Sequence, residues 1–111
     1  MAAAHFKVDN LVAIVDNNGQ QIGGWNRDVM NLDPFPAKWQ AFGWKVIEVD
    51  GHIIPQLTQA FDRAKKIKGQ PTVIIAHTIK GKGVSFMENN PDFHGKAPNA
   101  IEVEIALKEL E

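Results

Sequence analysis

Residues 11–24 read LVAIVDNNGQQIGG, in which an apolar run stops abruptly at Asp16. The run Leu11–Val15 is rich in β-branched residues and has no polar interruption, which predicts a parallel strand covered on both faces. The polar, glycine-containing stretch that follows predicts a loop. Because ligands of open α/β sheets bind outside the carboxyl ends of the strands, we expect this loop to face a ligand site.

The composition indicates a soluble globular chain with a single domain. It has 111 residues, of which 44% are hydrophobic and 23% charged, and a formal net charge of −1. This balance gives no electrostatic basis for binding nucleic acid or an anionic membrane. The sequence has no cysteine, which excludes disulfides, thiol catalysis and a Cys-ligated metal. Its apolar runs are too short to span a bilayer and its N-terminus lacks the layout of a secretory signal, so we expect a cytoplasmic protein.

Further strands and helices are expected to alternate along the chain. Trp44–Val49 alternates as a second strand, and Thr72–Ile79 is a third strand rich in β-branched residues. One helix is expected to begin at an Asp33 cap and end at Gly43, and an amphipathic helix is expected over Ile53–Ile67. This βαβαβ order predicts an α/β fold: a three-layer α/β/α arrangement around a parallel sheet of about three strands.

The second half of the chain ends in a long loop and a helix. Residues 80–100 contain three glycines, three asparagines and two prolines without an apolar period, and a loop of this length in a compact domain is usually functional. A C-terminal amphipathic helix is expected over 101–111, with Ile101 and Ile105 facing inward. Residues 1–79 would then form the βαβαβ core, and 80–100 an active-site type of loop.

The first candidate site is Asn17-Asn18-Gly19, at the end of the first strand. Asn-Gly favours a tight turn, which needs no ligand. Alternatively, the side-chain oxygen of Asn18 and a following backbone carbonyl hold Mg²⁺, whose shell is completed by phosphate oxygens and water. The residues alone leave both interpretations open. The stretch Gly23–Asn31 beyond them is expected to be loop.

The second candidate site is Lys80-Gly81-Lys82-Gly83, which follows the third strand at the same edge of the expected sheet. Its glycines would let backbone N–H groups approach an anion closely, and lysine supplies a point charge suited to phosphate. The alternative is a flexible surface turn, since the sequence is not a P-loop.

Among the histidines, His94 is the candidate for chemistry. An imidazole in a polar loop can exchange protons near neutrality or donate to a phosphate oxygen, although an exposed loop histidine without a role is the alternative. His77 ends the third strand and is interpreted as a satisfied core or rim residue. No two histidines have the spacing of a zinc site. The three tryptophans are expected to be packing residues, because no basic stripe accompanies them.

Three segments together carry a family resemblance. They are MAAAHFKVDNLVAIVDNNGQQIGG (1–24), KWQAFGWKVIEVDGH (38–52) and PTVIIAHTIKGKGVSFMENNPDFHGKAPN (71–99). In order and without an evident gap, they resemble the later part of the thiamine-diphosphate-binding domain of transketolase. They look more like the N-terminal subunit of a bacterial split-gene transketolase than like deoxyxylulose-phosphate synthases or pyruvate dehydrogenase E1 components. The resemblance implies ketol transfer between sugar phosphates, as in the pentose phosphate pathway, with thiamine diphosphate and Mg²⁺.

The resemblance also implies roles for residues at matching positions. Asn18 would be a Mg²⁺ ligand, with the backbone carbonyl of Gln20 as another. Ile22 and Ile79 match apolar positions that pack near the cofactor rings. His94 matches a catalytic histidine that contacts the diphosphate and faces the substrate channel. The two lysines of the glycine-containing loop lie in the family's active-site loop without a definite contact.

The sequence departs from the family at the start of the diphosphate motif. That motif begins with a Gly-Asp-Gly triplet, which this sequence does not contain, and its aspartate is the charged Mg²⁺ ligand. The resemblance therefore implies a truncated domain that is inactive alone and that pairs as a homo-oligomer or with a complementary transketolase subunit. The alternatives are a non-catalytic phosphate- or diphosphate-binding module, and a purely structural or oligomerisation domain that binds no cofactor.

Overall fold

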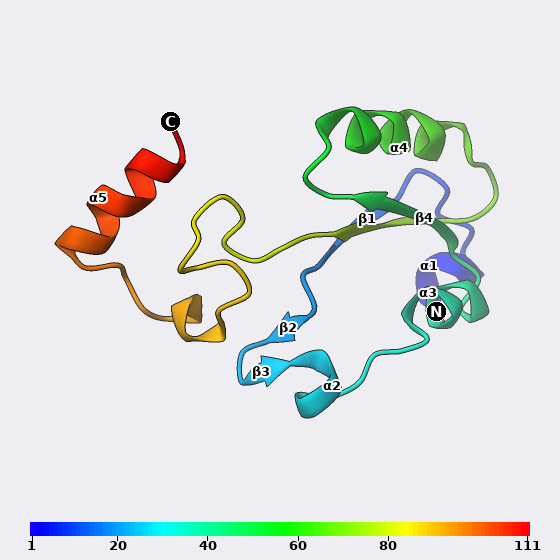
Figure 1. Ribbon diagram of the computed structural model, residues 1–111. Helices are drawn as coiled ribbons and strands as arrows, with labels where there is room; N and C mark the ends of the chain where they lie inside the picture. The colour runs from blue at the N-terminus through cyan, green and yellow to red at the C-terminus, as the bar shows by residue number, and fades with distance from the viewer. The chain divides into compact units, whose positions relative to one another are not determined.

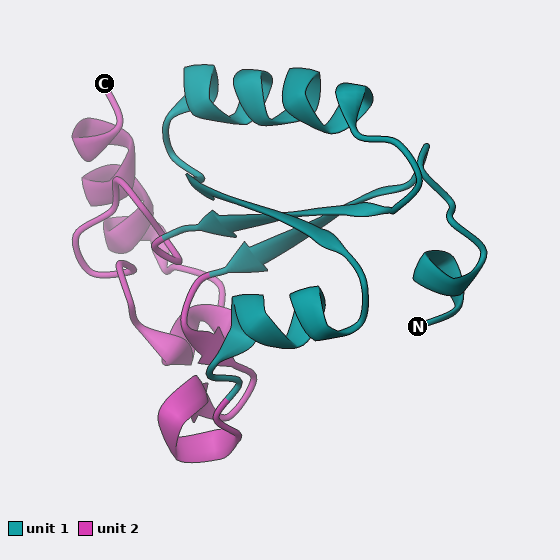
Figure 2. Cartoon of the chain, turned by 90° about the vertical axis from the view of Figure 1, so that its right-hand side faces the viewer, with its two compact units in different colours: residues 1–17, 32–78 teal, residues 18–31, 79–111 magenta.

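The chain divides into two compact units (Figure 2). The structure is a computed structural model that describes residues 1–111. Unit 1 comprises Met1–Asn17 and Leu32–Thr78, and unit 2 comprises Asn18–Asn31 and Ile79–Glu111. The polypeptide therefore leaves unit 1 twice, each time immediately beyond the end of a strand.

Unit 1 is built on a parallel sheet of three strands (Figure 1). These are β1 (Val12–Asn17), β4 (Lys45–Asp50) and β5 (Thr72–His77), in the order β1-β5-β4. Both neighbouring pairs are parallel, and Ile14 of β1 lies opposite Ile74 of β5. The last strand along the chain is thus the central one, which requires the crossover connections of an α/β fold.

Helices cover both faces of this sheet. α4 (Ile54–Lys66) packs on β4 and β5, and α3 (Phe35–Ala41) lies on the opposite side, where it packs on β4 (Figure 2). A short helix, α1 (Ala2–His5), precedes β1. The predicted three-layer α/β/α arrangement is confirmed. No helix combines the length and the apolar character needed to cross a membrane. The core between the sheet and α4 consists of Ile47, Val49, Ala60, Ala64, Ile74 and Ala76.

The expectation that the first strand is covered on both faces is wrong. β1 is an edge strand, and 57% of Ile14 is exposed. The cause is that α4 packs mainly on β4 and β5, so that Val12 of β1 reaches the core while Ile14 remains largely uncovered. An uninterrupted apolar run therefore did not distinguish a central strand from an edge strand. The strand also continues two residues further than expected, to Asn17.

The start of α3 also differs from the expectation. No side chain caps the helix, whose N-cap is Pro34 rather than Asp33. The helix ends before Gly43, which has a φ of +82°.

The rings of Trp39 and Trp44 meet edge to face with centroids 5.0 Å apart. These two tryptophans are packing residues, as expected.

In unit 2 the loop expected after the first strand contains regular structure. β2 (Gln20–Gln21) and β3 (Gly24–Trp25) form a two-stranded antiparallel hairpin, and α2 (Asn26–Val29) follows at once. Strands of two residues are too short to show an alternating apolar pattern, so no period in the sequence predicts them.

The loop 80–100 is compact and contains one short 3₁₀ helix, η1 (Pro91–His94). The backbone N–H of Asn89 donates to the carbonyl of Lys80 at 2.9 Å, which closes residues 80–89 into a loop. Val84 is buried inside unit 2, with 7% of its surface exposed. This segment therefore has its own small core.

The last helix is α5 (Ala100–Glu109), whose N-terminus is capped reciprocally. Asn99 accepts hydrogen bonds from the first helical N–H groups, and the side chain of Glu102 accepts one from the Asn99 N–H at 2.7 Å. The expectation that Ile101 and Ile105 face inward is wrong, because they are 72% and 42% exposed. Polar contacts of Glu102 and Glu109, rather than an apolar stripe, attach this helix to the preceding loop, which is why apolar spacing misplaced its inner face.

Candidate functional site

Unit 2 contains a cavity of about 220 Å³ whose walls come from two segments far apart in the sequence. One segment is the turn after β1 with the start of the hairpin, and the other runs from the lysine loop (residues 80–89) to η1. Of the five residues implied by the family resemblance, four line this cavity and Ile79 does not. The lining residues are Asn18, Gln20, Gln21, Ile22, Lys80, Pro91 and His94.

Asn18 forms a tight turn and lines the cavity at the same time. Its Oδ1 accepts a hydrogen bond from the backbone N–H of Gln20 at 2.9 Å. Gly19 lies in this turn with a φ of +75°, a conformation that favours glycine. The turn predicted as the simpler interpretation is therefore present, and it fixes the Asn18 amide at the cavity wall.

Gln20 contributes a side-chain amide that sequence reasoning missed, since only its backbone carbonyl was singled out. The Oε1 and Nε2 atoms of Gln20 are both buried and have no hydrogen-bond partner in the protein. Buried polar atoms are normally paired with protein, water or ligand. Its neighbour Gln21 is held in place, because its Nε2 donates to the carbonyl of Met30 at 2.8 Å.

The two lysines of the glycine-containing loop have different surroundings. Lys80 lines the cavity, whereas the Nζ of Lys82 lies 3.4 Å from a carboxylate oxygen of Glu88. Gly81 allows the two sides of the lysine loop to approach each other closely. It has a φ of +73°, and a Cβ at this position would lie 2.6 Å from the carbonyl oxygen of Met87. Only glycine fits this close approach of the two sides of the loop.

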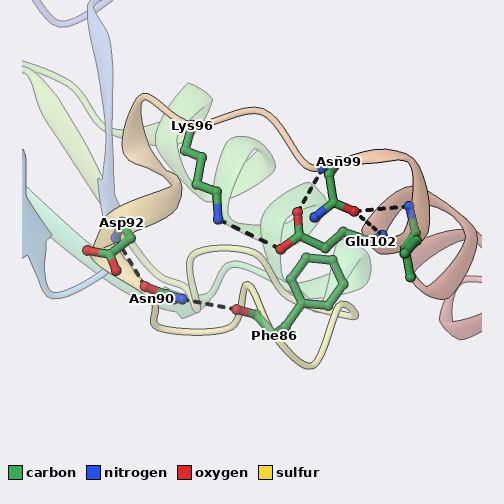
Figure 3. Close-up of polar contacts among 7 residues, drawn as sticks. Phe86, Asn90, Asp92, Lys96, Asn99 and Glu102 are labelled. Carbon is green, nitrogen blue, oxygen red and sulfur yellow. Dashed lines mark hydrogen bonds and ion pairs between the residues drawn. The ribbon is translucent and has the colours of Figure 1, made fainter.

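His94 is exposed at the end of η1 and lines the cavity. Asn90 begins η1 by accepting a hydrogen bond from the N–H of Asp92 at 3.1 Å. The amide of Asn90 also donates to the carbonyl of Phe86 at 3.1 Å (Figure 3). One asparagine therefore both starts the helix that carries His94 and ties it to the lysine loop.

The donor set of the cavity fits an anion. The lining residues provide amide groups, the Lys80 ammonium and the His94 imidazole, and none carries a carboxylate. Such groups suit phosphate or diphosphate oxygens. They do not suit a bare Mg²⁺, because Asn18 and the Gln20 carbonyl offer neutral oxygens beside a cationic lysine. No group of three or more His, Cys, Asp or Glu side chains is arranged to hold a metal ion.

His77 lies in unit 1, at the end of β5. Its Nε2 is 3.0 Å from a carboxylate oxygen of Glu48, and its Nδ1 is 3.4 Å from the amide nitrogen of Asn17. It is half-exposed, as expected for a satisfied rim residue.

The parallel sheet with helices on both faces defines unit 1 as an α/β unit, and unit 2 contains a cavity lined by amide, lysine and histidine side chains. A family model described as the transketolase thiamine diphosphate binding domain matches residues 1–110. The chain belongs to this family.

Curated relatives include subunits of split transketolases. One such subunit, from the apulose-4-phosphate transketolase of Actinobacillus succinogenes, is 42% identical over 110 residues, which make up 99% of this chain and 40% of that protein. The 6-deoxy-6-sulfo-D-fructose transketolase subunit SqwG of a Clostridium species is 38% identical over 111 residues, again 40% of its length. The chain thus spans about two fifths of these relatives. The predicted resemblance to a split-gene transketolase subunit is confirmed.

A solved structure supports the fold. The transketolase of Campylobacter jejuni superposes with a TM-score of 0.89 at 28% sequence identity, covering 97% of this chain and 17% of that one.

Proposed function

We propose that this chain binds the diphosphate end of thiamine diphosphate as part of a two-subunit transketolase. The observation that carries the proposal is the cavity in which Lys80 and His94 meet the Asn18 turn. The lysine and the imidazole come from one segment and the amide groups from another, so a diphosphate in the cavity would be held from both sides. The family's cofactor carries such a group.

Each lining residue has a definite task in this proposal. The Lys80 ammonium supplies a positive charge, and the amides of Asn18 and Gln20 donate hydrogen bonds to phosphate oxygens. His94 would donate a hydrogen bond to a phosphate oxygen and would face the sugar phosphate. Ile22, which is 78% exposed, would pack beside the cofactor rings. When bound, thiamine diphosphate supplies the electron sink for two-carbon ketol transfer, and the residues named here bind and orient it.

Mg²⁺ enters this proposal only together with the diphosphate. Mg²⁺ needs six oxygen ligands and dehydrates reluctantly. The Asn18 side chain and the Gln20 carbonyl would supply two of them, and phosphate oxygens and water the rest. We therefore expect no binding of Mg²⁺ alone, and tighter binding of thiamine diphosphate when Mg²⁺ is added.

We further propose that the chain acts with a partner and has no turnover alone. β1 is an edge strand with Ile14 exposed on one face, and such edges favour pairing with another chain. The partner is a complementary transketolase subunit or a second copy of this chain. Light scattering that finds a folded monomer at micromolar concentration excludes the second copy. Ketol transfer by the purified chain with thiamine diphosphate, Mg²⁺, a ketose phosphate and an aldose phosphate would overturn the proposed inactivity.

Calorimetric titration with thiamine diphosphate, with and without Mg²⁺, tests the binding proposal. We expect heat of binding with the wild type and clearly weaker binding with Lys80→Ala, because the ammonium is lost from the cavity. Lys68→Ala is the matched control, since Lys68 is exposed and lies outside the cavity. Equal affinities for both variants would contradict the assignment.

A purely structural or oligomerisation domain is the second candidate function. It is favoured by the apolar side chains that α5 exposes, among which Ile101 is 72% and Leu107 60% exposed. A chain that self-associates but gives no heat with thiamine diphosphate would support this alternative.

A further inference from the structure

The C-terminal end of α5 is attached to the tip of the lysine loop. The backbone N–H and the hydroxyl of Ser85 each donate to one carboxylate oxygen of Glu109, both at 2.6 Å. The next residue, Leu110, also packs near the tip of the loop, since a Cβ built on Gly83 would lie 3.0 Å from Leu110 Cδ2. The last turn of α5 therefore rests against residues 83–85.

The N-terminal end of α5 is attached to the segment just after His94. Glu102, in the first turn of the helix, lies 3.7 Å from the Nζ of Lys96 (Figure 3). Lys96 in turn lies over the ring of Phe93, 4.9 Å from its centroid. The Phe93 ring packs against Phe86 of the lysine loop at 5.5 Å between centroids. Opposite ends of one helix thus contact the two segments that carry the basic groups of the cavity.

We propose that α5 is a brace that sets the distance between Lys80 and His94 and thereby the affinity of the cavity for a diphosphate, with Glu109 as its key positioning residue. This inference rests on the proposed binding function and adds a regulatory element to it. Glu109 does not line the cavity and acts through Ser85.

The lysine loop is rigid enough to transmit this contact. The Asn89 N–H donates to the Lys80 carbonyl at 2.9 Å, and the Gly83 N–H donates to Glu88 Oε1 at 3.0 Å. Val84, which is buried, adds packing between these bonds, so the tip and the base of the loop are connected. Ser85 and Glu109 are both exposed, so loss of their contact leaves each group solvated. Variants at Glu109 are therefore expected to fold.

Titration of the full chain with inorganic pyrophosphate tests the brace. We expect Glu109→Ala, which removes both hydrogen bonds to Ser85, to bind pyrophosphate about fivefold more weakly than the wild type, because both bonds are solvent-exposed and each contributes little. Glu109→Gln keeps an acceptor for the Ser85 N–H and is expected to restore part of the affinity. The matched control is Glu104→Ala, which removes an exposed carboxylate from the same helix and is expected to change nothing.

The double variant distinguishes a positioning role of Glu109 from a purely structural one. If Glu109 acts through the lysine loop, Glu109→Ala combined with Lys80→Ala binds no more weakly than Lys80→Ala alone. Amide hydrogen exchange, which needs no ligand, is expected to speed up at Lys82–Met87 in Glu109→Ala only. The brace is overturned if the wild type binds pyrophosphate and Glu109→Ala binds it equally well. It is also overturned if the losses of affinity of the two single variants add in the double variant. A wild type that does not bind pyrophosphate refutes the proposed function instead, and the inference falls with it.

Discussion

The Glu109 carboxylate accepts two hydrogen bonds from Ser85, one oxygen from the hydroxyl and the other from the backbone N–H. The hydrogen bond from the Ser85 hydroxyl, followed by the one from its backbone N–H, holds the pKa of Glu109 below its ordinary value of 4.5, while desolvation and the nearby charge of Glu88 oppose this shift. Hydrogen bonds donated to a carboxylate stabilise its charged form relative to the protonated acid.

This relationship predicts a specific pH dependence. Because the folded-state pKa of Glu109 is depressed, its contribution to stability is present above the ordinary value of 4.5 and is lost as the pH falls through the lowered pKa. We expect the Ser85 amide to exchange faster as the pH drops through this window, after correction for intrinsic exchange. In Glu109→Gln the corrected rate should stay flat, and a wild-type rate that also stays flat would contradict this role of the carboxylate.

The cap of α5 gives a second prediction. Asn99→Ala removes the side chain that accepts from the first N–H groups of the helix, and we expect a loss of about 1 kcal/mol, as for other N-caps. Urea denaturation followed by far-UV circular dichroism measures this loss. Asn10→Ala serves as the control, since Asn10 is an exposed asparagine outside helices and strands. An equal effect of both substitutions would argue against the cap.

The sheet gives a third prediction from two isoleucines that lie opposite one another. Ile74→Val removes a methyl group from a fully buried site and should cost about 1 kcal/mol. Ile14→Val changes a side chain that is 57% exposed on the edge strand, so we expect less than about 0.5 kcal/mol. The free energy of unfolding in urea is the measurement. Equal losses would mean that another chain covers β1 under the conditions of the experiment.

The lysine loop gives a fourth prediction, from two glycines with nearly the same backbone. Gly81 and Gly69 have φ values of +73° and +75°, so alanine is strained at both. Only at Gly81 would the new Cβ meet another atom, the Met87 carbonyl oxygen at 2.6 Å, whereas nothing lies within 4 Å at Gly69. We expect Gly81→Ala to reduce pyrophosphate affinity and Gly69→Ala to leave it unchanged. Titration calorimetry compares the pyrophosphate affinities of the two variants. Similar affinities would contradict a role of the lysine-loop conformation in binding.

The α/β layers were predictable from the sequence because long β-branched and amphipathic runs carry their own period. The runs at β4 and α4 have such a period and β5 is a run of β-branched residues, and the bounds of all three in the structure lie within two residues of those expected. The hairpin of β2 and β3 has none, and the edge position of β1 depends on where α4 packs. Ile101 was misplaced because α5 contacts its neighbours through polar side chains, Glu102 with Lys96 and Glu109 with Ser85.

The residues of the cavity were predictable only in part. Asn18 and His94 follow from the family resemblance, and Lys80 was suggested by glycines beside a lysine. The side-chain amide of Gln20 has no sequence signal, since its burial depends on the fold of the hairpin. Ile79, expected beside the cofactor rings, does not line the cavity.

The cavity between the Asn18 turn and Lys80 is proposed to bind a diphosphate. The most direct test is a ¹⁵N nuclear magnetic resonance titration of the full chain with thiamine diphosphate and Mg²⁺. We predict that the largest shifts occur at the side-chain amides of Asn18, Gln20 and Gln21 and at the backbone N–H of Lys80. Absence of shifts, or shifts confined to residues outside the cavity, would contradict the claim.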